Sequence, residues 1–266
     1  MEHDSITPLM QDRIRQTLTQ IEKTQRIKIL YACESGSRGW GFASRDSDYD
    51  VRFIYVHQLD WYLTLDRKRD VIERPIDDEL DVAGWELSKA LKLMRNSNPA
   101  LIEWLHSPIV YQKDALFMQQ CEQLASKFYS PLKARYHYLS IAKRNWREDF
   151  KEETIRLKKY FYILRAVLAL RWIEHSKMMP PMAFSQLVQA TVTDHAVLAE
   201  IEQLLVMKQH ADESRYGPHR PAIDRLIIET IEKSEKLNLP EPYYRDSHLL
   251  DDFLQKTILA NDIKWE

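Results

Sequence analysis

The spacing of hydrophobic residues predicts both helices and strands in the first part of the chain. Met10, Ile14, Leu18 and Ile21 recur at intervals of three or four, which indicates an amphipathic helix over residues 8–24. Short apolar runs after it, rich in β-branched and aromatic residues, predict strands. The expected strands are 27–33, 51–56, 79–85 and, at an edge, 109–111; the expected helices are 87–96 and 99–106, and 61–65 fits either type.

From about residue 114 onward the hydrophobic pattern is helical, and prolines separate successive apolar stripes. Helices are predicted over residues 115–129, 132–150, 152–175, 183–191, 194–211, 221–237 and 247–260. This shift predicts an α+β protein of two domains. Residues 1–113 would form a small mixed β-sheet backed by helices, and residues 114–266 an all-helical domain that closes a cleft.

The composition is that of a globular protein with a sizeable core. Hydrophobic residues make up 44% and charged residues 29% of the 266 residues. The two cysteines, Cys33 and Cys121, exclude a disulfide framework. The first residues lack a signal-peptide pattern and no long uncharged apolar run occurs, so we expect a cytoplasmic protein without a membrane partner. The net charge of -2 gives no overall nucleic-acid footprint, and the oligomeric state is left open.

Glycines cluster between the first two predicted strands. Gly36, Gly39 and Gly41 are three of only five glycines in the chain. Such a cluster marks a backbone that turns sharply or approaches a ligand closely. At a strand-to-helix junction, the backbone N–H groups of Gly36 and Ser37 would form a cradle for an anion such as phosphate. The turn lacks the features of a P-loop or a dinucleotide fingerprint, and a plain tight turn is the alternative.

Two carboxylates stand where the second predicted strand begins. Asp48 and Asp50 are two residues apart, so a strand would point both side chains to the same face. A divalent cation relieves the repulsion between them, and Mg²⁺ prefers such oxygen ligands and brings substrate phosphates with it. The alternative is an acidic, solvated start of a strand.

The order of these residues resembles a known signature. Gly36-Ser37, ten further residues and then Asp48-Tyr49-Asp50-Val51 resemble the motif of the DNA polymerase β-type nucleotidyltransferase superfamily. The longer string, from Glu34-Ser-Gly-Ser-Arg to Asp50-Val-Arg-Phe, is similar to a bacterial subfamily of RNA-repair-pathway-associated predicted nucleotidyltransferases (RlaP-like). Ser35 departs from the apolar residue that the general pattern favours. The motif lies within the first of the two expected domains, which the resemblance makes the catalytic one.

The resemblance implies a nucleotidyltransferase fold with a third carboxylate on a later strand. Asp81, flanked by apolar residues in the third predicted strand, matches that position. Glu79 shares its face and is the second choice, whereas the acidic pair 77–78 falls in an expected solvated turn. Asp48, Asp50 and Asp81 would then be the catalytic residues and the ligands of two Mg²⁺ ions.

The predicted helical domain contains a basic segment. Residues 133–171 hold eleven Lys or Arg and four Asp or Glu, a formal +7. Such a segment suits a triphosphate or an RNA backbone, and a solvated helix face with internal ion pairs is the alternative. In relatives with a helical second domain a lysine touches the triphosphate, and by that resemblance Lys159 is the first candidate and Lys143 the second. Arg38, beside the glycine turn, is a further candidate.

The function that the resemblance implies is metal-assisted nucleotidyl transfer. A nucleoside monophosphate, AMP in the first instance, would pass from a nucleoside triphosphate to a hydroxyl acceptor, and pyrophosphate would leave. An RNA end is one candidate acceptor, and a protein or a small molecule is another. A nucleotide-binding or regulatory module without turnover is the alternative of a different class, which the third carboxylate disfavours.

Overall fold

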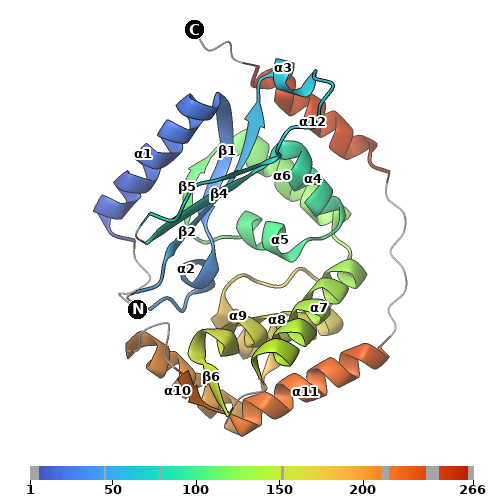
Figure 1. The fold of residues 1–266 in the computed structure, drawn as a ribbon. Coiled ribbons are helices and arrows are strands. Elements are labelled where there is room, and N and C mark those ends of the chain that lie inside the picture. The colour runs from blue at the N-terminus through green and yellow to red at the C-terminus, as the bar shows by residue number, and fades with distance from the viewer. Residues whose placement is uncertain are drawn as a thin grey trace. The chain divides into compact units, whose positions relative to one another are not determined.

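A computed structural model describes residues 6–44, 46–77, 79–150, 153–210, 216–237 and 246–262. These residues divide into two compact units. The first, called the sheet unit below, comprises residues 6–36, 48–129 and 246–262. The second, called the helical unit, comprises residues 37–44, 46–47, 130–150, 153–210 and 216–237. Figure 1 labels their elements.

The sheet unit is built on five strands. They are β1 (Ile27–Glu34), β2 (Tyr49–His57), β3 (Val71–Glu73), β4 (Leu80–Glu86) and β5 (Val110–Lys113), and they lie in the order β3-β4-β2-β1-β5. β2 and β4 run parallel, whereas the pairs β1–β2, β1–β5 and β3–β4 are antiparallel. The sheet is therefore mixed, as the sequence predicts, and residues paired across β2 and β4 point to the same face.

One face of this sheet is covered by α1 (Pro8–Gln25) (Figure 1). The hydroxyl of Thr7 caps the helix by accepting the N–H of Met10 at 3.3 Å. The buried stripe of α1 packs with the odd-numbered residues of β2 from 49 to 55. Because side chains alternate along a strand, Asp50 and Arg52 point to the opposite face.

The opposite face carries a group of helices. They are α4 (Leu87–Arg95), α5 (Pro99–Leu105), α6 (Ala115–Phe128) and, from the end of the chain, α12 (His248–Ala260). α4 packs against β2, β4, α5, α6 and α12. Trp85 of β4 stacks on Trp104 of α5 with ring centroids 3.7 Å apart, and the Tyr31 hydroxyl donates to the carbonyl of Trp104 at 2.6 Å. A short helix, α3 (Leu59–Tyr62), follows β2.

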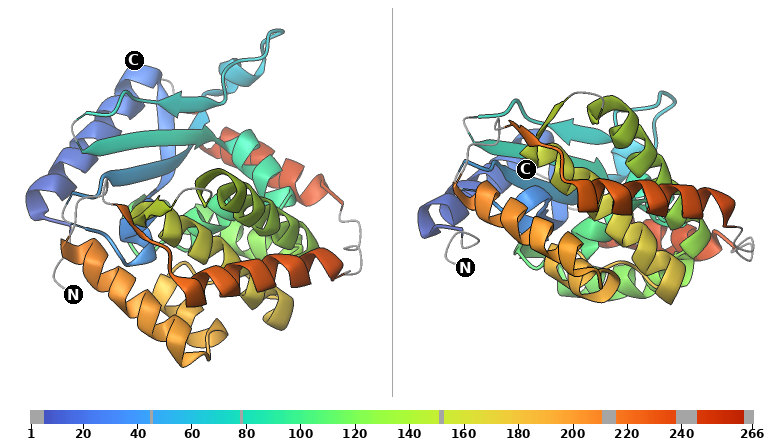
Figure 2. Two further views of the ribbon diagram at one scale, coloured as in Figure 1. Left: turned by 60° about the horizontal axis from the view of Figure 1, so that its bottom comes forward. Right: turned by 90° about the horizontal axis from the view of Figure 1, so that it is seen from below.

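The helical unit is organised around one buried helix. Its helices are α7 (Pro131–Asp149), α8 (Leu157–Ser176), α9 (Phe184–Thr191), α10 (His195–His210) and α11 (Pro221–Lys236). α8 packs against each of the other four, and Figure 2 shows α7, α8 and α11 side by side. Two short strands, β6 (Thr154–Arg156) and β7 (Tyr216–Pro218), pair antiparallel beside them.

Residues 37–44 and 46–47 pack with the helical unit although they are close in sequence to β1 and β2. The ring of Phe42 stacks on Phe161 at 4.7 Å and meets Phe184 edge-on at 5.3 Å. The guanidinium of Arg38, whose residue is 5% exposed, donates to the carbonyl of Ser47 at 2.8 Å. Aromatic burial therefore fixes this segment to helices that come more than a hundred residues later.

The predicted helices and the strands β1, β2, β4 and β5 are present, with ends that shift by a few residues. The ambiguous stretch 61–65 begins within α3. Three strands of three residues, β3, β6 and β7, were not predicted because they are too short to show a periodic pattern. The units also divide differently from the expected boundary after residue 113, because α6 and α12 belong to the sheet unit. That grouping is set by tertiary packing, which a linear pattern does not record.

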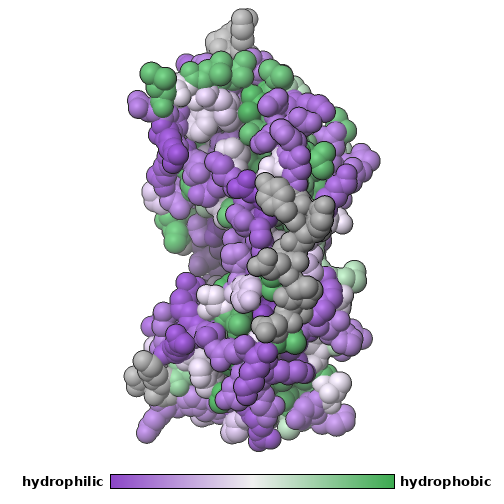
Figure 3. All heavy atoms as spheres, turned by 90° about the vertical axis from the view of Figure 1, so that its right-hand side faces the viewer, coloured by the Kyte–Doolittle hydropathy of each residue, from purple (hydrophilic) through white to green (hydrophobic). Residues whose placement is uncertain are grey.

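The surface is polar over most of the face drawn in Figure 3, where hydrophilic residues separate the hydrophobic ones. Among the described helices, none is both long enough and apolar enough to cross a lipid bilayer.

Candidate active site

Gly36 stands where β1 gives way to α2 (Gly36–Trp40). Its φ is +58°, in the left-handed region that favours glycine. A Cβ atom added at Gly36 would lie 1.9 Å from Oδ2 of Asp50. Two independent constraints therefore require glycine at this position: the backbone conformation, and the carboxylate that lies directly against it.

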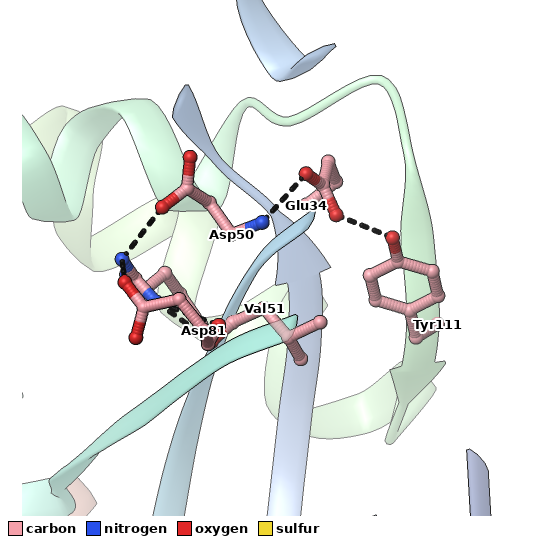
Figure 4. Close-up of polar contacts among 6 residues, drawn as sticks. Glu34, Asp50, Val51, Asp81 and Tyr111 are labelled. Carbon is pink, nitrogen blue, oxygen red and sulfur yellow. Dashed lines mark hydrogen bonds and ion pairs between the residues drawn. The ribbon is translucent and has the colours of Figure 1, made fainter. Parts of the chain in front are cut away.

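Asp50 and Asp81 lie side by side near the start of two parallel strands. They are paired in the register between β2 and β4, so both side chains leave the sheet on the face opposite α1. The side chains are 25% and 29% exposed. Figure 4 shows both carboxylates turned toward the same guanidinium nitrogen. The sequence predicted that these two residues share a site, and the structure brings them together.

The guanidinium between them belongs to Arg52. Its Nη2 donates to Oδ1 of Asp50 at 2.9 Å and to Oδ2 of Asp81 at 2.7 Å. Its Nη1 donates to the backbone carbonyls of Val51 and Asp81, at 3.1 and 3.0 Å. Arg52 was not predicted from the sequence as a site residue. Its position two residues after Asp50, on the same face of β2, is the signal that points to it.

A second residue that was not predicted from the sequence is Glu34, at the end of β1. It is fully buried, and its Oε1 accepts the backbone N–H of Asp50 at 2.9 Å. Its Oε2 accepts the hydroxyl of Tyr111 (Figure 4). Its carbonyl accepts the hydroxyl of Ser107 at 2.5 Å. Glu34 therefore fixes the backbone of Asp50 from behind the site. Its signals in the sequence are its place directly after an apolar run and at the start of the string that resembles the bacterial subfamily.

Asp48 is half-buried and lies one residue before β2 begins. Its role as a metal ligand stays a prediction. The backbone carbonyl of Glu79, the second choice for the third carboxylate, accepts the N–H of Tyr49 at 2.7 Å, and Glu79 is exposed. Asp77 forms an exposed ion pair with Arg13 at 3.1 Å, and Asp78 lies outside the described residues.

The carboxylates of Asp50 and Asp81 suit a Mg²⁺ ion that binds together with a nucleotide. Within the described residues, no cluster of three or more His, Cys, Asp or Glu side chains is placed to hold a metal. Asp50 and Asp81 provide two carboxylates, and Mg²⁺ is commonly held by one or two carboxylates together with substrate phosphates and water. These residues therefore fit a Mg²⁺ ion that binds together with a nucleotide better than they fit an all-protein cage of three carboxylates.

The other predicted phosphate contacts lie in the helical unit, and their roles stay predictions. Ser37 and Arg38 belong to α2, where Arg38 is buried. Lys159 is half-buried at the start of α8. Lys143 forms an ion pair with Glu235 and lies in a cavity of about 710 Å³ along α7. The Lys143 ammonium, through its hydrogen bond, lowers the pKa of the Glu235 carboxyl.

The two thiols are not nucleophiles. Burial raises the pKa of both Cys33, on β1, and Cys121, on α6, to about 12. Both cysteines are buried and free. A thiolate is the reactive form of cysteine, so neither residue supports covalent catalysis near neutral pH.

The mixed sheet, its left-handed glycine and the paired aspartates define a nucleotidyltransferase-like protein of the DNA polymerase β type. The model of the family described as "RlaP: RNA repair pathway DNA polymerase beta family" matches residues 10–256. The chain belongs to this family, which confirms the resemblance drawn from the motif around Gly36 and Asp50.

Two individual proteins are similar to this chain. It is 44% identical over 224 residues to the uncharacterized protein YcgL of Bacillus subtilis (strain 168), an alignment that covers 84% of this chain and 86% of YcgL. A crystal structure of a nucleotidyltransferase-like protein from Exiguobacterium sibiricum 255-15 is 13% identical, with a TM-score of 0.31, and the match covers 96% of this chain and 82% of that one.

Proposed function

We propose that this protein is a Mg²⁺-dependent nucleotidyltransferase that transfers a nucleoside monophosphate, AMP in the first instance, from a nucleoside triphosphate to a hydroxyl acceptor. The observation that supports this most is the pairing of Asp50 with Asp81 on parallel strands, with Gly36 directly against Asp50. In a chain of a polymerase β family, two carboxylates beside a left-handed glycine turn support the proposal.

Asp50 and Asp81, with Asp48 as the third candidate, would hold the Mg²⁺ ions. Bound Mg²⁺ offsets the negative charge of the phosphates and lowers the pKa of an acceptor hydroxyl. The protein's own residues supply the positioning. Gly36 allows the backbone to approach the phosphates without a side chain between them. In this proposal the N–H groups of Gly36 and Ser37 donate hydrogen bonds to the phosphates.

The proposed reaction is a nucleophilic displacement at the α-phosphorus of the nucleoside triphosphate. The acceptor oxygen forms a new bond to that phosphorus, and the bond to the bridging oxygen of the pyrophosphate breaks. Pyrophosphate leaves with the electron pair, and the hydroxyl proton passes to solvent. Because phosphoryl chemistry of this kind depends on positioning and electrostatics, fixing the carboxylates is the main task of the fold. Arg38, Lys159 and Lys143 remain the proposed contacts of the helical unit with the phosphates.

The acceptor that we favour is an RNA end, because the family's description places it in an RNA repair pathway. The purified full chain, incubated with Mg²⁺, each labelled nucleoside triphosphate and RNA of defined ends, should transfer label to the RNA and release pyrophosphate. Label on the RNA identifies the acceptor directly.

Three variants sharpen this experiment. Asp50→Asn and Asp81→Asn should each lower the transfer rate by about 10³-fold, which corresponds to about 4 kcal/mol of barrier. Asp70→Asn is the matched control, since Asp70 forms an ion pair with Lys89 at 3.1 Å in the same unit. Full activity in Asp50→Asn, or no transfer by the unchanged protein to RNA, protein or small-molecule hydroxyls, would defeat the proposal.

A further inference from the structure

Asp50 and Asp81 share a cation that the chain itself provides. Each side chain places one carboxylate oxygen on Nη2 of Arg52, at 2.9 and 2.7 Å. We propose that Arg52 is a positioning residue that acts as the built-in counter-ion of this pair. It holds both carboxylates in place before any cation binds, and it weakens the binding of a divalent cation to them.

The need for a counter-ion follows from the strand register. Asp50 and Asp81 are direct partners on neighbouring strands, and like charges placed opposite one another destabilise a sheet. Both side chains are only partly exposed, so water screens their repulsion incompletely. A cation that contacts both oxygens at hydrogen-bond distance removes most of this repulsion.

The position of the guanidinium is set by the backbone. While Nη2 contacts the carboxylates, Nη1 donates to the carbonyls of Val51 and Asp81, which belong to β2 and β4. Those carbonyls are fixed by the sheet, and the Arg52 side chain is only 17% exposed. The planar fork of arginine makes all four contacts at once, a geometry that a lysine ammonium on a flexible stem does not reproduce.

The consequence for metal binding is electrostatic. Arg52 reduces the formal charge of the cluster from -2 to -1, and it engages Oδ1 of Asp50 and Oδ2 of Asp81. Oδ2 of Asp50 is the oxygen that lies against Gly36. A divalent cation therefore meets a pair that is already partly neutralised, which favours an ion that arrives with the negative phosphates of a nucleotide over a free ion.

The positioning half of this inference stands on the geometry alone, whereas the metal half rests on the proposed function. We would compare the full chain with Arg52→Met, which keeps the aliphatic stem and removes the charge. In buffer with EDTA, Arg52→Met should lower the Tm by about 4 °C or more. Combining it with Asp81→Asn should lower the Tm by less than the sum of the two single changes, because the repulsion that Arg52 relieves is then gone.

The claim that Arg52 weakens divalent-cation binding is tested on the same proteins by titration with MgCl₂ or MnCl₂ alone. Arg52→Met should gain a larger rise in Tm on saturation and bind the ion about tenfold more tightly, because a cation now replaces the lost guanidinium. The rise in Tm and the ion affinity of Arg52→Lys should lie between those of Arg52→Met and the unchanged protein. Arg52→Lys also replaces Arg52→Met in this comparison if Arg52→Met does not fold. Arg69→Met removes an exposed ion pair to Glu73 and should leave the metal response unchanged.

An unchanged metal-free Tm in Arg52→Met, or strictly additive effects with Asp81→Asn, would overturn the positioning role. The claim that Arg52 weakens divalent-cation binding would be overturned by weaker Mg²⁺ binding in Arg52→Met than in the unchanged protein. It would also be overturned if the ion changed the Tm of neither protein. Neither result depends on turnover, so the transfer assay judges the proposed function separately.

Discussion

The buried carboxylate of Glu34 accepts the backbone N–H of Asp50 at 2.9 Å, which ties the end of β1 to the start of β2 (Figure 4). The same carboxylate accepts the hydroxyl of Tyr111 on β5. Three strands of the sheet therefore meet at one buried side chain, directly behind the candidate site. A buried carboxylate is costly unless its oxygens are hydrogen-bonded, and here both oxygens are.

Replacing Glu34 tests this link. Glu34→Met leaves the Asp50 N–H and the Tyr111 hydroxyl without their buried acceptor, at a cost of about 1–3 kcal/mol for each group. Glu34→Gln keeps an amide oxygen for Asp50 and should cost less. Urea unfolding measures the difference, and the transfer rate should fall in the same order. Equal stability of the Met and Gln variants would show that the hydrogen bond to Asp50 contributes nothing.

Gly36→Ala should damage the site beyond its effect on the backbone. The left-handed conformation costs a non-glycine residue about 1–2 kcal/mol. At Gly36 the added Cβ also overlaps Oδ2 of Asp50, so the carboxylate must move. Gly41→Ala is the matched control, because Gly41 has φ +84° and, apart from its chain neighbours, no described atom lies within 4 Å of the added Cβ. Similar unfolding free energies and similar transfer rates for the two variants would contradict the close approach at Gly36.

The pKa of His57 is lowered to about 4, first by burial and then by the nearby charge of Lys68, while Asp60 acts in the opposite direction. The ring stacks on Trp61 with centroids 4.1 Å apart. Since the unfolded chain takes up this proton near pH 6.5 and the folded chain only near pH 4, stability should fall as the pH drops through that window. Below it both states are protonated and His57 adds no further change.

Thermal unfolding between pH 7 and pH 4 measures this contribution. His57→Gln should show a decrease in Tm that is smaller by a few °C than that of the unchanged protein. Parallel Tm curves for the two proteins across the whole range would show that His57 titrates normally in the folded state.

The reactivity of the two thiols tests whether Cys33 on β1 and Cys121 on α6 are buried in the folded protein. Cys33 and Cys121 have pKa values raised to about 12 by burial. Neither should react with a thiol reagent in the folded protein at pH 8, and both should react at once in denaturant. Rapid modification of one thiol before unfolding would place that residue in an accessible environment.

The sequence was sufficient to predict the parts of the site that depend on local pattern. The glycine after one apolar run predicted a turn at Gly36, and the aspartate before the next run predicted Asp50 at the start of a strand. Asp81 was predicted by its match to a family motif, and its pairing with Asp50 follows from the register of β2 and β4. Such predictions succeed because strand periodicity and glycine conformation are properties of short segments.

The contacts of Arg52 and Glu34 were beyond the sequence because they depend on register between strands. Arg52 reaches Asp81 only because β4, which follows β2 at a distance of more than twenty residues, pairs with it in parallel. Glu34 faces Asp50 through the pairing of β1 with β2, which contains an irregularity between residues 29 and 31. The attachment of Phe42 to the helical unit is likewise a matter of tertiary packing.

The most direct test of the central claim is to measure the equilibrium binding of Mn²⁺ together with a non-hydrolysable triphosphate analogue. Binding is monitored by the decrease of the spectroscopic signal of free Mn²⁺. The account predicts saturable binding by the unchanged protein that weakens by at least about tenfold in both Asp50→Asn and Asp81→Asn, while Asp70→Asn binds normally. Equal affinity in all four proteins would contradict the claim that Asp50 and Asp81 form the metal–nucleotide site.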